Sequence, residues 1–160
     1  MHPTEINRLQ NEIRRLLLAE KDMCLVADAA EVMAESDYVS CRELVQVGMV
    51  VAYCRPFSGG PPREPMTEVD ALAPTSSLHA RLFEVRNKLY AHTDDDYRLR
   101  REAVDPFGEH SYSEESAMLI PDLLLPIRDL ARENEGRFRE ERQAREQRLR
   151  DEGVPPKPYP

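Results

Sequence analysis

The N-terminal part of the chain carries apolar residues at helical spacing. The members of this stripe are Ile6, Leu9, Ile13, Leu16 and Leu17, followed more weakly by Met23, Ala27, Ala30 and Met33. A period near 3.6 residues predicts an amphipathic helix, and Thr4 is the expected N-cap. Because the stripe weakens in its middle, the pattern allows either one very long helix or a helix broken near Lys21-Asp22.

A second apolar block, "LVQVGMVVAYC", follows the tetrapeptide "SCRE" at 40–43. Ser40 and Glu43 have the spacing of a capping box, which predicts a helix that reaches about Tyr53. The block is rich in β-branched residues, so a strand is the alternative. The capping signal and the length of the block favour the helix.

Residues 56–75 contain five prolines and two glycines, which predicts a loop. A third helix is expected from Ser76 or Ser77 to about Ala91, because the residues of its apolar stripe follow helical spacing. These are Leu78, Leu82, Val85 and Leu89. An irregular connection, "TDDDYRLRREAVDPFGEHSYS", follows, and a fourth helix is expected from near Ser113 with a bend at Pro121 or Pro126.

The chain becomes strongly charged from Arg128 onward, with glutamates four residues ahead of arginines. The pairs are Glu133–Arg137, Glu135–Arg139, Glu141–Arg145 and Glu146–Arg150. Each pair supports a helix, but the apolar residues are too sparse to predict a packed face. The expected architecture is therefore an all-α bundle of four to five helices over 1–130, with a charged helix over 131–152 that projects into solvent. A disordered tail is expected over 153–160.

Composition narrows the class of protein. No apolar run approaches the length that spans a bilayer, and the first residues lack the pattern of a secretory signal. Cys24, Cys41 and Cys54 show no C-x-x-C spacing, which favours reduced, buried thiols in the cytoplasm. The formal net charge of −8 argues against a surface that grips nucleic acid broadly. However, residues 81–101 hold six basic residues against four acidic ones.

The segment "RLFEVRNKLYAHTDDD" at 81–96 carries the richest chemistry. Arg86 supplies a planar fork that suits phosphate oxygens, and His92 can exchange a proton near neutral pH. Together they suffice for metal-free RNA cleavage. In the competing interpretation, His92 caps the apolar stripe and Arg86 pairs with an acid. An unbroken helix would aim the two side chains apart, so the site requires either a loosened helix end or two copies of the helix about a twofold axis.

The heptapeptide "RNKLYAH", from Arg86 to His92, resembles the R-x(4–6)-H motif of the HEPN superfamily of small all-α proteins. Asn87 matches the polar residue that commonly follows the arginine, and "TDDD" resembles the continuation in HEPN-like proteins of phage-defence systems. The resemblance implies a homodimer with a composite site, metal-independent endoribonuclease activity, and a role as a toxin or defence component with a partner such as an antitoxin. Members paired with nucleotidyltransferase antitoxins carry a tyrosine where this chain has Asp94.

The resemblance also assigns roles to individual residues. Arg86 would stabilise the phosphate, His92 would act as general base or acid, and Asn87 would orient the site. The neighbouring side chains Lys88, Tyr90 and His79 are candidates for substrate binding.

No metal or cofactor is expected. The three aspartates after His92 lack the alternating ligands of a calcium loop, the histidines and cysteines lack zinc spacing, and no glycine-rich phosphate loop occurs. Two rival hypotheses remain open. One is a non-catalytic helical module that binds a protein partner or nucleotide. The other makes the charged C-terminal helix an assembly arm on a plain bundle.

Overall fold

The computed structural model describes residues 1–35, 42–58, 74–87 and 121–157. Within these ranges every regular element is helical, which confirms the all-α prediction. The elements are α1 (Pro3–Glu35), α2 (Arg42–Cys54), α4 (Ser77–Arg86), a 3-10 turn η2 (Pro121–Leu123) and α6 (Leu124–Asp151). None of the helices in the described part of the chain has the length and apolar character needed to cross a bilayer.

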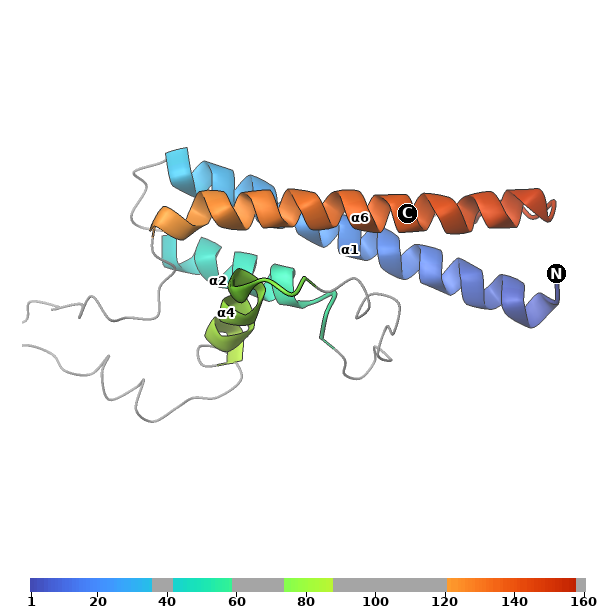
Figure 1. Cartoon of the computed structure of the whole chain (residues 1–160), viewed down its shortest axis with the longest axis horizontal. Helices are drawn as coiled ribbons and strands as arrows, with labels where there is room; N and C mark the ends of the chain where they lie inside the picture. The colour runs from blue at the N-terminus through green and yellow to red at the C-terminus, as the bar shows by residue number, and fades with distance from the viewer. Residues whose placement is uncertain (36–41, 59–73, 88–120, 158–160) are drawn as a thin grey trace, which may run out of the picture.

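The two longest helices, α1 and α6, lie antiparallel along one another and form the spine of the molecule (Figure 1). Ion pairs at both ends fix this direction: Arg148 near the end of α6 pairs with Glu5, whereas Arg132 pairs with Asp28. The shorter helices α2 and α4 pack beside one half of this pair (Figure 1). Among the described residues, four helices therefore contribute to the core at one end and two at the other.

Helix α1 begins one residue before the predicted N-cap, so the assignment of Thr4 was wrong. The backbone carbonyl of His2 accepts hydrogen bonds from the N–H groups of Glu5 and Ile6, and its Nδ1 accepts from the Thr4 N–H at 3.3 Å. Pro3 occupies the first helical position, where its missing N–H leaves no bond unmade. The first residue of a helix can differ by one from the predicted position because several neighbouring residues can cap the N-terminus.

Helix α1 is continuous through Lys21-Asp22, where the sequence also allowed a break. Asp22 is buried, and Arg55, in the turn just after α2, donates to its carboxylate at 2.8 Å. Asp22, the polar residue that interrupts the apolar stripe, thus makes a tertiary contact with the segment after α2. Helix α1 itself is unbroken at this position.

The block that ends in Cys54 is the helix α2 and not a strand. Ser40 of the predicted capping box lies outside the described residues. Helix α4 starts as predicted, with the Ser76 hydroxyl accepting from the backbone N–H of His79 at 3.1 Å. It is described to Arg86, and the predicted continuation to Ala91 lies outside the described ranges.

The predicted start of the last helix near Ser113 also lies outside the described residues. Pro121 opens the 3-10 turn, and Pro126 falls in the first turn of α6. The first N–H groups of a helix have no partner within the helix, so proline is tolerated there. Neither proline therefore interrupts the hydrogen bonds of α6.

The prediction that the charged C-terminal helix projects into solvent was wrong. Helix α6 lies against α1, and the residues that it buries recur at intervals of three and four. They are Leu124, Ile127, Ala131, Asn134, Phe138 and, after a gap, Leu149. The predicted boundary at 130/131 falls inside this helix, and Phe138 beyond it packs in the main core.

Polar residues fill the gap in this seam. Arg142 and Arg145 of α6 are largely buried there, and they donate to Glu20 and Glu12 of α1 at 2.9 and 3.1 Å. On one side of this polar layer lies the main core, and on the other lies a small cluster of Leu9, Ile13 and Leu149. Sparse apolar residues suffice for packing because ion pairs complete the seam and specify its register.

The end of α6 is a formed cap, so the tail expected over 153–160 begins in ordered structure. Gly153 has a φ of +72°, and its N–H donates to the Arg150 carbonyl at 2.9 Å. The Val154 N–H donates to the Leu149 carbonyl, also at 2.9 Å. The side chain of Val154 packs on the small cluster of Leu9, Ile13 and Leu149. This is a Schellman motif, in which glycine accepts the left-handed conformation at least cost.

Candidate functional site

Helices α2, α4 and α6 meet in a cluster of aromatic rings inside the main core. Its members are Tyr53, Phe57, His79, Phe83 and Phe138. The ring centroids of His79 and Phe83 are 4.9 Å apart, and those of Phe57 and His79 are 5.0 Å apart in an edge-to-face arrangement. Such offset and edge contacts are the favourable geometries for aromatic pairs. The cluster fixes α4 against α2.

Tyr53 and His79 supply the only polar link within this cluster: the Tyr53 hydroxyl lies 2.9 Å from Nδ1 of His79. Burial raises the pKa of the Tyr53 hydroxyl, so it keeps its proton. Burial lowers the pKa of His79, so the imidazole is neutral, and its tautomer decides which of the two groups donates. The pair is a neutral hydrogen bond that suits an apolar environment.

Asn134 of α6 is a buried polar residue with 1% exposure. Its amide lies close enough to the Tyr53 hydroxyl to act against the raised pKa of that group. Nevertheless, neither side-chain polar atom of Asn134 makes a hydrogen bond of good geometry with the described residues. A buried amide that lacks such a bond costs free energy, so Asn134 is a weak point between Ala131 and Phe138 of the main core.

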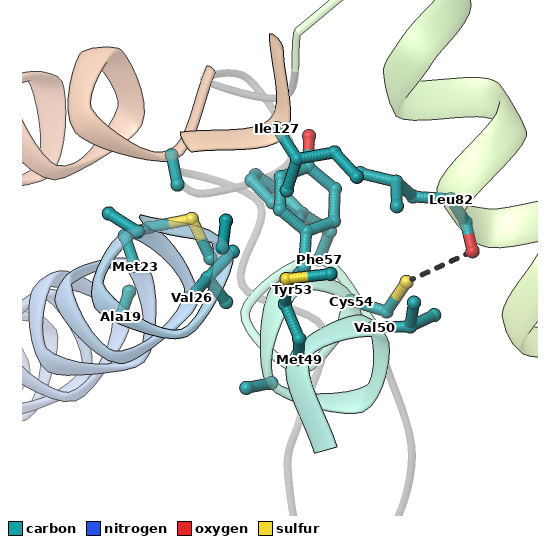
Figure 2. Close-up of a cluster of buried hydrophobic side chains, with 14 of the residues drawn as sticks. Ala19, Met23, Val26, Met49, Val50, Tyr53, Cys54, Phe57, Leu82 and Ile127 are labelled. Atoms are coloured by element: carbon teal, nitrogen blue, oxygen red, sulfur yellow. Dashed lines mark hydrogen bonds between the residues drawn. The ribbon is translucent and has the colours of Figure 1, made fainter. Parts of the chain in front are cut away.

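Cys54, the last residue of α2, is fully buried beside α4. Figure 2 shows its thiol directed at the backbone carbonyl of Leu82, at a sulfur–oxygen distance of 3.7 Å. Burial raises the pKa of this thiol to about 12, and the positive charge of Arg86 opposes the rise. Arg86 is therefore near enough to α2 for its charge to act there. The prediction of a buried cysteine is confirmed for Cys54.

Arg86 and Asn87 lie at the end of α4, where the sequence places the phosphate-binding part of the motif. Arg86 is half-buried and Asn87 is exposed. Asn87 is the C-cap, and its backbone N–H donates to the carbonyls of Phe83 and Glu84. Consecutive helical residues point about 100° apart, so the guanidinium lies along the α2 side while the Asn87 amide faces solvent.

The other predicted site residues have different outcomes. His92, Lys88 and Tyr90 lie outside the described residues. His79 lies seven residues before Arg86, about two helical turns away, in the aromatic cluster. Its contacts with Tyr53 and Phe57 favour a packing role.

Sequence reasoning passed over Tyr53 and Asn134. A signal for Asn134 was present, because it interrupts the apolar spacing that Ile127, Ala131 and Phe138 define on α6. For Tyr53 there was none, since a tyrosine near the end of an apolar helix is ordinary.

Within the described ranges no three histidine, cysteine, aspartate or glutamate side chains gather as metal ligands would. Comparison with models of protein families, with characterised proteins and with solved structures finds no match to this chain.

Proposed function

We propose that this protein is a metal-independent endoribonuclease of the HEPN type that acts in a toxin or phage-defence system, with its site at the end of α4. The supporting observation is the pair Arg86 and Asn87, a half-buried and an exposed residue at consecutive positions at the end of α4. A guanidinium held from one side by packing loses less conformational freedom when it binds a phosphate.

The proposed reaction is an internal transesterification. His92 removes the proton from a ribose 2′-hydroxyl, and the 2′-oxygen attacks the adjacent phosphorus while the bond to the 5′-oxygen breaks. A histidinium protonates the departing 5′-oxygen, which leaves a 2′,3′-cyclic phosphate and a 5′-hydroxyl. Arg86 stabilises the charge that develops on the phosphoryl oxygens, and Asn87 orients the phosphate. A homodimer would supply the second copy of the motif.

The test is cleavage of single-stranded RNA by the full chain in EDTA. The wild-type protein should yield cyclic-phosphate ends, and both Arg86→Ala and His92→Ala should lower the rate at least about 100-fold. Arg81→Ala is the matched control, because Arg81 is exposed on the same helix and pairs only with Glu84 among the described residues. Full activity in His92→Ala would refute this mechanism.

A non-catalytic helical module that binds a protein partner or nucleotide is the second candidate. The observation in its favour is electrostatic. The arginines of α6 that face α1 are all paired with α1 carboxylates: Arg132, Arg139, Arg142, Arg145 and Arg148. With a net charge of −8, few of these cations remain to neutralise a phosphate backbone. Under this hypothesis the wild-type chain leaves RNA intact.

The third hypothesis makes the charged C-terminal helix an assembly arm. Truncation of this helix cannot test that hypothesis. Removal of the chain after Leu130 would delete Phe138 and Leu149, which are fully buried. A truncated chain would therefore lose function through unfolding under every hypothesis.

A further inference from the structure

The end of the α1–α6 pair that lies away from α2 and α4 is held together by the small apolar cluster (Figure 1). Leu9 and Ile13 of α1 and Leu149 of α6 are 2%, 0% and 0% exposed there. Among the described residues, these three are the buried members of the cluster. We define the tip of the pair as residues 3–13 of α1 together with residues 145–154.

The main core, in contrast, takes buried side chains from α1, α2, α4 and α6. On α6 its last buried apolar residue is Phe138, and the next one is Leu149 in the tip, about 16 Å further along the helix. Arg142 and Arg145 face α1 in this interval, and their side chains are 18% and 17% exposed. The apolar seam is therefore interrupted on α6 between the main core and the tip.

This interruption gives the tip an open state of its own. Opening of the tip costs free energy because its three buried apolar side chains become exposed. Opening of the adjoining turns costs less, because water then solvates Arg142, Arg145 and their partners Glu20 and Glu12, and the released chain gains conformational entropy. Opening of the main core costs much more, since its buried apolar side chains are far more numerous.

We propose that the tip opens and closes as a unit, a clasp at one end of the α1–α6 pair, while the main core stays folded. Opening of the clasp exposes the small cluster and separates Arg148 from Glu5, whose ion pair crosses the tip. Regions with few buried apolar contacts commonly open in this way, at a lower free energy than the whole domain. The clasp goes beyond the proposed function and does not depend on it, because it uses none of the residues at the end of α4.

Native-state hydrogen exchange on the full chain, followed at increasing guanidinium below the unfolding transition, tests the clasp. The amide groups of residues 7–13 and 145–151 should share one protection factor, at least about 100-fold lower than that of residues 23–30 and 131–138 in the main core. Their exchange should also depend less on guanidinium, because opening of the tip exposes less surface than global unfolding does.

Ile13→Val and Ile127→Val form a matched pair of variants. Both isoleucines are helical and 0% exposed, one in the tip and one in the main core. Each change removes one methylene from a buried side chain and should speed exchange about threefold or more in the regions whose opening exposes that side chain. Ile127→Val should therefore act on the main core alone, because the tip opens without disturbing Ile127. Ile13→Val should act on both regions, because global unfolding also exposes the tip.

The clasp is overturned if the tip and the main core share one protection factor and one dependence on guanidinium. It is equally overturned by protection that declines residue by residue toward each helix end, which is the signature of simple fraying. An Ile127→Val variant that speeds exchange in both regions alike would show a single cooperative unit. RNA cleavage by the wild-type chain, or its absence, bears on the proposed nuclease alone and leaves these outcomes unchanged.

Discussion

The Tyr53 hydroxyl and Nδ1 of His79 are 2.9 Å apart, and this bond joins α2 to α4 inside the aromatic cluster. Both groups are displaced in pKa by burial, Tyr53 upward and His79 downward, so both are neutral at physiological pH. A neutral hydrogen bond is the form that the apolar surroundings favour. The bond determines how the stability of the α2–α4 contact responds to acid.

We expect the fold to lose stability through His79 as the pH falls below about 6.5, the ordinary pKa of histidine. The unfolded chain takes up a proton there, whereas the folded chain resists it because its His79 pKa is lower. The contribution of His79 to the free energy of unfolding is therefore complete above the ordinary histidine pKa. It declines as the pH falls toward the pKa of His79 in the folded chain. His79→Phe should remove this dependence and cost about 1 kcal/mol at pH 8 through the unpaired Tyr53 hydroxyl.

Denaturant unfolding of the wild type and of His79→Phe across this pH range measures the effect. An identical pH profile for the wild type and His79→Phe would contradict the prediction.

Glu20 should contribute to stability through two arginines of α6. It is 14% exposed and accepts from Nε of Arg142 and Nε of Arg139, each at 2.9 Å. Burial alone would raise its pKa, but the two guanidinium groups outweigh burial and lower it. Glu20→Gln should cost roughly 1–2 kcal/mol at pH 7, between the values for exposed and buried pairs.

The sign of the pH dependence follows from the lowered pKa of Glu20. The advantage of the wild type over Glu20→Gln should be complete above the ordinary glutamate pKa of 4.5 and should vanish as the pH falls through the folded value. Thermal unfolding in acidic buffers would reveal this. Glu140→Gln, at an exposed position of α6, should have little effect at any pH. Equal losses in both variants would argue against a specific role for Glu20.

The interhelical ion pairs explain what the sequence could predict of the fold and what it could not. Helical periods predicted α1, α2 and the start of α4, because each depends on neighbours within a few residues. The arginines of α6 were predicted to pair within their own helix, and the pairs Glu135–Arg139, Glu141–Arg145 and Glu146–Arg150 do form. Arg139 and Arg145 also reach α1 carboxylates more than 100 residues earlier, and only the packed structure discloses such partners.

The candidate site also has features that the sequence predicted and features that it could not predict. Local spacing placed Arg86 and Asn87 in the third predicted helix, and α4 is described to Arg86. It could not disclose that His79 faces Tyr53, because that contact joins residues on different helices. The assignment of His92 stays a prediction.

Cys54 should resist chemical modification until the chain unfolds. Its thiol is buried, and with a pKa of about 12 almost none of it is thiolate at pH 8. Cys24 is only half-buried and should react with iodoacetamide earlier. Peptide mass spectrometry after timed alkylation distinguishes the two residues, and the label on Cys54 should appear at the rate of unfolding as denaturant is added. Rapid native labelling of Cys54 would show that the end of α2 opens.

The buried amide of Asn134, which makes no hydrogen bond of good geometry with the described residues, should make the natural chain less stable than a simple variant. Leucine has the same branched skeleton of heavy atoms as asparagine, so Asn134→Leu replaces the two unsatisfied polar atoms with carbons and little change of shape. We expect a gain of about 1 kcal/mol in the free energy of unfolding, measured in guanidinium. Gln143→Leu, at an exposed position on the same helix, is the control and should change stability by much less. Destabilisation by Asn134→Leu would show instead that the amide has a partner whose loss costs more than its desolvation.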